Sequence, residues 1–256
     1  METLTSRKNE LIRHVRLLGA DRAARQTAGE FVCDGTKLLR EALLHGAEIT
    51  AALWASPPTA DIPCARQYLV PPELLDYVSP LKSAADVVFT VKRRHWALAP
   101  PGRALVLETI QDPGNLGTIL RTANALGMDS VVLTGACADP YSPKAVRATM
   151  GAVFRQRFYV MERTALRAYL TEHGVRLYGA ALSPAAADIR SMDLRGAAVA
   201  IGSEGQGMSA ELRALCDGEL IIPMRGGCES LNAAVAAAIV MWELGRQERG
   251  NEKSEI

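Results

Sequence analysis

Short apolar runs and segments with apolar residues at helical spacing alternate along the whole chain. Apolar runs of about four to eight residues indicate strands, and apolar residues that recur every three to four positions indicate amphipathic helices. Residues 1–98 therefore predict a small α/β domain. Its predicted strands are 30–34, 49–54, 65–70 and 86–91, and its predicted helices are 8–28, 37–45 and one that opens at 71–73.

From residue 103 onward, strands and helices alternate regularly, which predicts a mostly parallel sheet in an α/β fold. Most of these strands lack polar positions at every second residue, as expected when helices cover both faces of a sheet. The predicted strands are 104–107, 130–133, 154–160, 176–181, 197–201 and 219–222, and the predicted helices are 116–126, 143–150, 163–173, 209–215 and 233–246.

Residues 94–102 carry two prolines and a glycine between apolar strands, which is typical of a linker. We therefore place the domain boundary here rather than interpret the segment as a loop within one domain. The sequence predicts a first domain at 1–98, a second at 103–247, and a charged flexible tail at 248–256.

The chain has 256 residues, 48% of them hydrophobic, and a formal net charge of +1. Overall charge therefore gives no sign of a polyanionic partner, but local clusters of basic residues do. Such clusters suit phosphate groups, although solvated surface is the commoner use of any single one. The basic positions predicted to contact phosphate groups are Arg7, Lys8, Arg13, Lys144 and Arg147.

Five cysteines are scattered through the chain without a CxxC pair. This spacing indicates a reducing compartment and neither a disulfide framework nor a zinc site. The four histidines form no group with ligand spacing, so no metal is expected. No leader pattern is present, and the longest apolar run, 233–242, is too short to span a bilayer. We expect a cytoplasmic protein that does not enter membranes.

Three polar loops follow predicted strands, where α/β enzymes place their chemistry. In the first, a turn at 112–114 leads into a helix that carries Asn115 and Arg121. Without further context, this segment equally fits an ordinary strand-turn-helix unit. The second, residues 202–207, has glycines at 202, 205 and 207, which allow backbone N–H groups to approach a ligand. Its spacing is not the dinucleotide fingerprint.

In the third loop, Ser230 and Asn232 stand at the start of an alanine-rich helix. Backbone N–H groups there are unsatisfied and the helix dipole is positive, which favours ligand binding. The alternative is that either residue is only an N-cap.

Together, the stretches at 112–123, 201–207 and 222–232 resemble the SpoU/TrmH family of RNA ribose 2′-O-methyltransferases in the SPOUT superfamily. Residues 141–154 resemble the segment between the family's motifs. Residues 5–9 and 31–39 resemble its appended RNA-binding domain, which is like a small ribosomal protein. The resemblance implies a C-terminal trefoil knot, a homodimer, and S-adenosyl-L-methionine as cofactor.

The resemblance also implies roles for particular residues. The implied catalytic residues are Arg121, Asn115, Glu204, Ser230 and Asn232. The implied cofactor-binding residues are Thr134, Gly135, Gly202, Glu204, Gly207, Ile222, Met224, Ser230 and Leu231. The chain departs from the family pattern at Ala233 and Ala234, where Val and Ser are frequent.

The resulting hypothesis is a methyltransferase that modifies a ribose 2′-hydroxyl in structured RNA, with 23S ribosomal RNA as first choice and tRNA as the alternative. A catalytically silent RNA-binding protein and a nicotinamide-dependent enzyme are the competing classes. The resemblance assigns Arg121 as base, but guanidinium stays protonated, so charge stabilisation or phosphate orientation is an open alternative. The modified nucleotide, and whether the modification confers antibiotic resistance, are not readable from the sequence.

Overall fold

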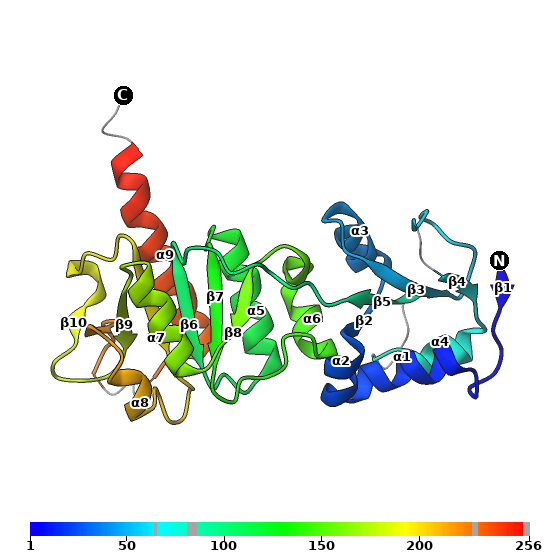
Figure 1. The fold of residues 1–256 in the computed structure, drawn as a ribbon, viewed down its shortest axis with the longest axis horizontal. Coiled ribbons are helices and arrows are strands. Elements are labelled where there is room, and N and C mark those ends of the chain that lie inside the picture. Colours follow the sequence, from blue (N-terminus) through cyan, green and yellow to red (C-terminus); the bar gives the residue numbers. More distant parts are fainter. Residues whose placement is uncertain (64–65, 81–85, 227–229, 253–256) are drawn as a thin grey trace. The chain divides into compact units, whose positions relative to one another are not determined.

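The computed structural model describes residues 1–63, 66–80, 86–226 and 230–252, together with the side chains up to residue 247 outside those gaps (Figure 1). Glu229 of the third motif, Cys64 and Cys228 lie outside the described residues. Contacts divide the chain into two compact units. The first comprises Met1–His95 and Asp139–Arg155, and the second comprises Trp96–Ala138 and Gln156–Ile256.

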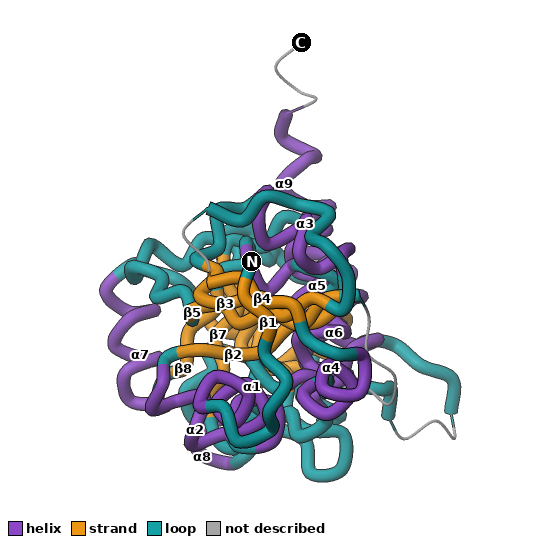
Figure 2. The backbone as a smooth tube through the Cα atoms, turned by 90° about the vertical axis from the view of Figure 1, so that its right-hand side faces the viewer, coloured by secondary structure: helices purple, strands orange, loops and turns teal. Residues whose placement is uncertain are grey.

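The first unit is built on a five-stranded mixed sheet in the order β1-β4-β3-β5-β2. Helix α3 lies on one side of this sheet, and α1, α2 and α4 lie on the other (Figures 1 and 2). The strands are β1 (Glu2–Thr3), β2 (Glu30–Asp34), β3 (Ile49–Trp54), β4 (Arg66–Leu69) and β5 (Val87–Lys92). The helices are α1 (Glu10–Ala20), α2 (Arg22–Ala28), α3 (Thr36–Leu44), α4 (Pro72–Val78), α6 (Pro143–Thr149) and the short η1 (Ala152–Phe154).

The single helix predicted over residues 8–28 is wrong, because Asp21 divides it into α1 and α2. The backbone of Asp21 is extended, and its carboxylate accepts hydrogen bonds from the N–H groups of Ala23 and Ala24. An aspartate that binds the next N–H groups favours a helix start over continuation. Apolar spacing alone does not reveal this break.

The grouping of residues 139–155 with the first unit differs from the predicted domain boundary. Arg25 is 5% exposed and donates from Nε to Asp139 over 2.7 Å and from a terminal nitrogen to the Leu18 carbonyl over 2.7 Å. The rings of Phe31 and Tyr141 lie 4.9 Å apart. These partners are more than a hundred residues apart in sequence, so periodicity carries no sign of them.

The second unit contains a seven-stranded sheet in the order β10-β12-β9-β11-β6-β7-β8. Every described pair in it is parallel, which confirms the predicted parallel sheet. The strands are β6 (Ala104–Glu108), β7 (Ser130–Thr134), β8 (Phe158–Val160), β9 (Arg176–Ala180), β10 (Ala187–Asp188), β11 (Ala197–Ile201) and β12 (Gly218–Ile221). The helices are α5 (Pro113–Ala125), α7 (Arg163–Glu172), η2 (Ile189–Ser191), α8 (Ala210–Arg213) and α9 (Ala233–Glu252).

Two predicted boundaries from residue 103 onward are wrong by four residues or more. Strand β8 starts at Phe158 rather than at residue 154, because Ala152–Phe154 form a 3-10 turn after Gly151. Helix α9 continues to Glu252 rather than ending at 246, so it extends into the segment predicted as a tail. Glutamate, arginine and glutamine are good helix formers, which explains how a charged sequence extends the helix.

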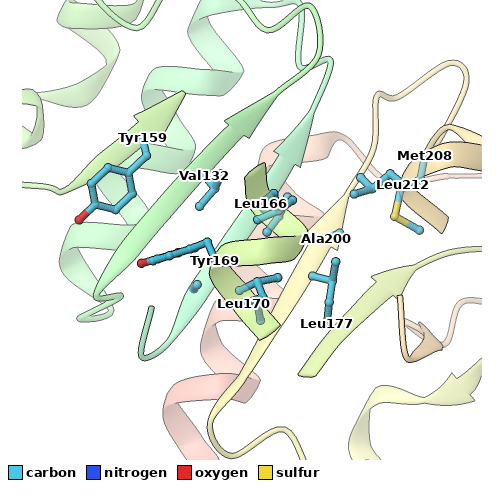
Figure 3. Packing of buried hydrophobic residues seen from close by; sticks show 12 residues of the cluster. Val132, Tyr159, Leu166, Tyr169, Leu170, Leu177, Ala200, Met208 and Leu212 are labelled. Carbon is cyan, nitrogen blue, oxygen red and sulfur yellow. The ribbon is translucent and has the colours of Figure 1, made fainter. Parts of the chain in front are cut away.

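Both faces of the central strands are buried, as the sequence predicts. On one face, Leu166, Tyr169 and Leu170 of α7 pack against alternate residues of the strands, such as Val132 and Ala200 (Figure 3). Intervening strand residues such as Leu105 are also fully buried. Since side chains alternate along a strand, these residues point to the opposite face. The sheet is thus a rigid base, and its carboxyl edge carries the three polar loops.

Candidate active site

A cavity of about 350 Å³ opens at the carboxyl ends of β9, β11 and β12. Its walls come from residues 180–182, the loop 202–207 and, between β12 and α9, Ile222, Met224, Ser230 and Leu231. Ligand sites in parallel sheets are expected at this edge. Seven of the nine predicted cofactor-binding residues line it, namely Gly202, Glu204, Gly207, Ile222, Met224, Ser230 and Leu231.

Thr134 and Gly135, the other two predicted cofactor residues, do not line this cavity. They lie at the end of β7, where the Thr134 carbonyl accepts a hydrogen bond from the Thr109 N–H over 3.1 Å. Gly135 has φ = 64°, and a Cβ there would lie 2.7 Å from the Thr109 hydroxyl. The ends of β6 and β7 pack closely at Thr134 and Gly135, which explains the position of these two residues.

The loop 202–207 folds back on itself. Ser203 and Gly207 exchange backbone hydrogen bonds of 3.1 and 2.9 Å. A Cβ at Gly202 would lie 2.0 Å from the backbone carbon of Gly207, closer than any real side chain can come. Gly207 itself has φ = 67°, in the left-handed region. Two of the three glycines are therefore required for the shape of the loop.

A polar cluster joins three predicted catalytic residues from separate loops. Glu204 Oε1 accepts hydrogen bonds from Asn115 Nδ2 at 2.5 Å and Asn232 Nδ2 at 2.9 Å. Asn232 Nδ2 also donates to Asn115 Oδ1 at 3.2 Å. No described group contacts Oε2 of Glu204 through a hydrogen bond. The fold thus brings together residues that are 89 and 28 positions apart in the chain.

Asn232 has a second role in the same place. Its Oδ1 accepts hydrogen bonds from the N–H groups of Ala234 and Val235, and Glu204 accepts one from the Ala233 N–H at 3.1 Å. These are the unsatisfied donors of the α9 N-terminus. Asn232 is therefore an N-cap and a cluster member at once, so the two interpretations of this residue do not exclude each other.

The structure does not bring Arg121 to this cluster. Asn115 and Arg121 are both on α5, but six residues of helix separate them by about 9 Å along the axis and roughly 240° around it. Arg121 is exposed and forms no hydrogen bond or ion pair with a described residue. Its guanidinium is available to a phosphate or a second chain.

A second cavity, of about 240 Å³, shares the loop with the first. It is lined by residues 109–112, 203–206 and Ala233, so Glu204 borders both cavities. Thr109 has φ = 57°, which is an uncommon backbone conformation for a β-branched residue. Sequence reasoning missed residues 109–111, because no residue type in this stretch signals the conformation.

The predicted RNA-binding residues are all exposed and all lie in the first unit. Arg7, Lys8 and Arg13 stand at the start of α1. The Arg7 guanidinium lies 4.5 Å from the centre of the Tyr77 ring, and that of Arg16 lies 5.1 Å from it. Lys144 and Arg147 are on α6. Arg16 belongs to the same basic cluster in the sequence, whereas Tyr77 is 61 positions away from it and reaches these arginines only through folding.

The described cysteines offer no activated nucleophile. Burial raises the pKa of Cys33 and Cys137, and it raises the pKa of Cys216 to about 11 with help from Glu219 and Asp217. A thiol with a raised pKa is protonated at neutral pH and reacts poorly. Within the described chain, no group of His, Cys, Asp and Glu residues could hold a metal ion, and no helix is long and apolar enough to cross a membrane.

Comparison with protein families matches residues 102–242 to the SpoU rRNA Methylase family. An uncharacterised tRNA/rRNA methyltransferase of Synechocystis is 34% identical over 96% of this chain and 94% of its own length. The 23S rRNA (guanosine(2553)-2′-O)-methyltransferase RlmP of Bacillus subtilis is 30% identical over 95% of this chain and 99% of its own. The AdoMet-bound rRNA methyltransferase from Sinorhizobium meliloti aligns with a TM-score of 0.86 and 26% identity, covering 96% of this chain and 97% of that structure.

Proposed function

The chain belongs to the SpoU rRNA Methylase family, and we propose that it uses S-adenosylmethionine to methylate a ribose 2′-hydroxyl in 23S ribosomal RNA. The observation that supports this proposal best is the hydrogen-bonded cluster of Asn115, Glu204 and Asn232, whose Glu204 lines two adjoining cavities. A transferase for two substrates needs such an arrangement, with one cavity for the donor and another for the acceptor.

The larger cavity suits the methyl donor. A volume of about 350 Å³ is within the range of small-molecule sites. Its apolar walls, including Ile222, Met224 and Leu231, can take the adenine, and the glycine loop lines the same cavity. When bound, S-adenosylmethionine supplies the reactive methyl group. The residues of this chain therefore have to orient the donor and exclude water.

The smaller cavity is the proposed place of the acceptor ribose. The 2′-hydroxyl must lose a proton, and Oε2 of Glu204 is the acceptor that the cluster leaves open toward a ligand. The amides of Asn115 and Asn232 fix the other carboxylate oxygen through hydrogen bonds. We assign Arg121 to phosphate orientation or charge stabilisation, because guanidinium does not give up its proton.

The partner we propose for the second unit is a second copy of this chain. Val235, Ile239 and Trp242 of α9 are exposed by 49%, 37% and 61% and follow each other at helical spacing. Exposed apolar stripes of this kind mark association surfaces. The family further suggests a C-terminal trefoil knot, and the insertion of β11 between β6 and β9 is compatible with it.

The test is transfer of a labelled methyl group to separated ribosomal RNA and tRNA, followed by mapping of the modified ribose. We expect label in 23S rRNA with the native chain and none with Asn115→Ala. If label appears in tRNA alone, the substrate is tRNA and not 23S rRNA. Binding of S-adenosylmethionine without transfer to any RNA would favour the catalytically silent protein, and binding of NAD instead would refute the proposal.

A further inference from the structure

A buried carboxylate lies directly behind the loop that separates the two cavities. Glu108, the last residue of β6, is 2% exposed. Its Oε1 accepts hydrogen bonds from Arg163 Nε and the Ser209 hydroxyl, both at 2.7 Å, and its Oε2 accepts one from the Ser209 N–H at 2.6 Å. A buried charge is costly unless it is paired and fully hydrogen-bonded, and this one satisfies both conditions.

Ser209 is the point where the glycine loop ends. Its hydroxyl accepts the Leu212 N–H at 3.1 Å and so caps the short helix α8. The preceding residue, Met208, lines the larger cavity, and its methyl carbon would lie 2.5 Å from a Cβ at Gly179. The other end of the loop continues from β11, which pairs with β6. Glu108 therefore anchors the end of the loop that the sheet does not hold.

We propose that Glu108 is a positioning residue, which fixes Ser209 and thereby holds residues 202–208 in the conformation that binds the methyl donor. Glu108 lines neither cavity, so it acts only through the loop. The same anchor sets the place of Glu204 relative to Asn115 and Asn232. The identity of the ligand in this inference rests on the proposed function. The effect of Glu108 on the conformation of the loop does not.

The chain offers a control at the other edge of the sheet. Asp217 also accepts a backbone N–H, that of Leu177 at 2.8 Å, and also lies near an arginine of α7, with 3.6 Å to Arg167. It stands at the amino ends of β9 and β12, the edge opposite to the cavities. Its side chain is 37% exposed, so Asp217→Asn reports the loss of a carboxylate with similar partners but without the burial of Glu108.

The experiment compares Glu108→Gln, Ser209→Ala, their double variant and Asp217→Asn with the native chain. Amide hydrogen exchange of the ligand-free proteins is measured across residues 203–209, and S-adenosylmethionine affinity is measured by calorimetry. We expect exchange in the loop to rise and the Kd for S-adenosylmethionine to increase about tenfold in Glu108→Gln, a change that corresponds to an ordinary interaction energy. Ser209→Ala gives a smaller effect, and the double variant resembles Glu108→Gln.

Two results would overturn the inference: unchanged loop exchange in Glu108→Gln, or an equal increase in Asp217→Asn. If Glu108→Gln does not fold, the exchange and affinity of Ser209→Ala decide in the same way. If the native chain binds no S-adenosylmethionine while Glu108→Gln still loosens the loop, the proposed function fails and the anchoring role of Glu108 stands. A higher KM for S-adenosylmethionine with the KM for RNA unchanged would further support the donor site.

Discussion

At the scale of single residues, Asn232 can be tested for its two roles separately. Serine caps helices about as well as asparagine, but it cannot donate from an amide to Glu204. We therefore expect Asn232→Ser to retain the thermal stability of the native chain and to lose most methyl transfer. Asn232→Ala should also lose about 1 kcal/mol of stability with the cap. Thermal unfolding and labelled-methyl transfer measure the two effects. Full activity of Asn232→Ser would show that Asn232 acts only as a helix cap.

The glycines of the loop provide a second residue-scale prediction. Gly202→Ala places a methyl group 2.0 Å from backbone atoms that cannot move independently, whereas a Cβ at Gly205 meets nothing within 4 Å. We expect Gly202→Ala to weaken S-adenosylmethionine binding at a cost of about 1–3 kcal/mol, the usual range for overpacking. Gly205→Ala is the control and should bind as the native chain does. Equal affinities of the two variants would mean that the loop adapts.

At the scale of elements, the exposed stripe on α9 predicts how the chain associates. Trp242→Glu puts a charge at the C-terminal end of this stripe, which association would have to desolvate. We expect the native chain to sediment as a dimer and Trp242→Glu as a monomer at micromolar concentration. Leu44→Glu, at another exposed apolar residue in the first unit, should remain dimeric. A monomeric native chain would contradict the prediction.

The elements also indicate what sequence patterns can predict. Strands 30–34, 49–54 and 197–201 have the predicted bounds, because apolar runs of this length have few alternatives. The break at Asp21 was missed because its cause is a side-chain hydrogen bond. Three site residues could be named from their motifs, but their meeting at Glu204 depends on long-range contacts. Glu108 sits at the end of an apolar strand, and only its partners in the fold distinguish it.

At the scale of the whole molecule, residues 139–155 make the two units more interdependent than a linker would. The chain passes between the units at residues 95–96, 138–139 and 155–156. Deletion of residues 1–98 would therefore leave Tyr141 and Phe154, now 4% and 3% exposed, without the surface that buries them. Loss of activity in such a truncated chain would not by itself demonstrate an RNA-binding role for the first unit.

A point substitution tests the same connection without removing a unit. Arg25→Gln leaves the Asp139 carboxylate, whose side chain is 11% exposed, without its ionic partner. Breaking a fully buried pair costs about 3–5 kcal/mol, which is the upper bound for this one. Arg25→Gln combined with Asp139→Asn removes both charges and should recover much of the loss. We expect this order in thermal unfolding, with Arg13→Gln, an exposed α1 position, close to the native chain. If Arg25→Gln proves as stable as the native chain, the ion pair does not fasten residues 139–155, and the aromatic contacts at Phe31 must do so.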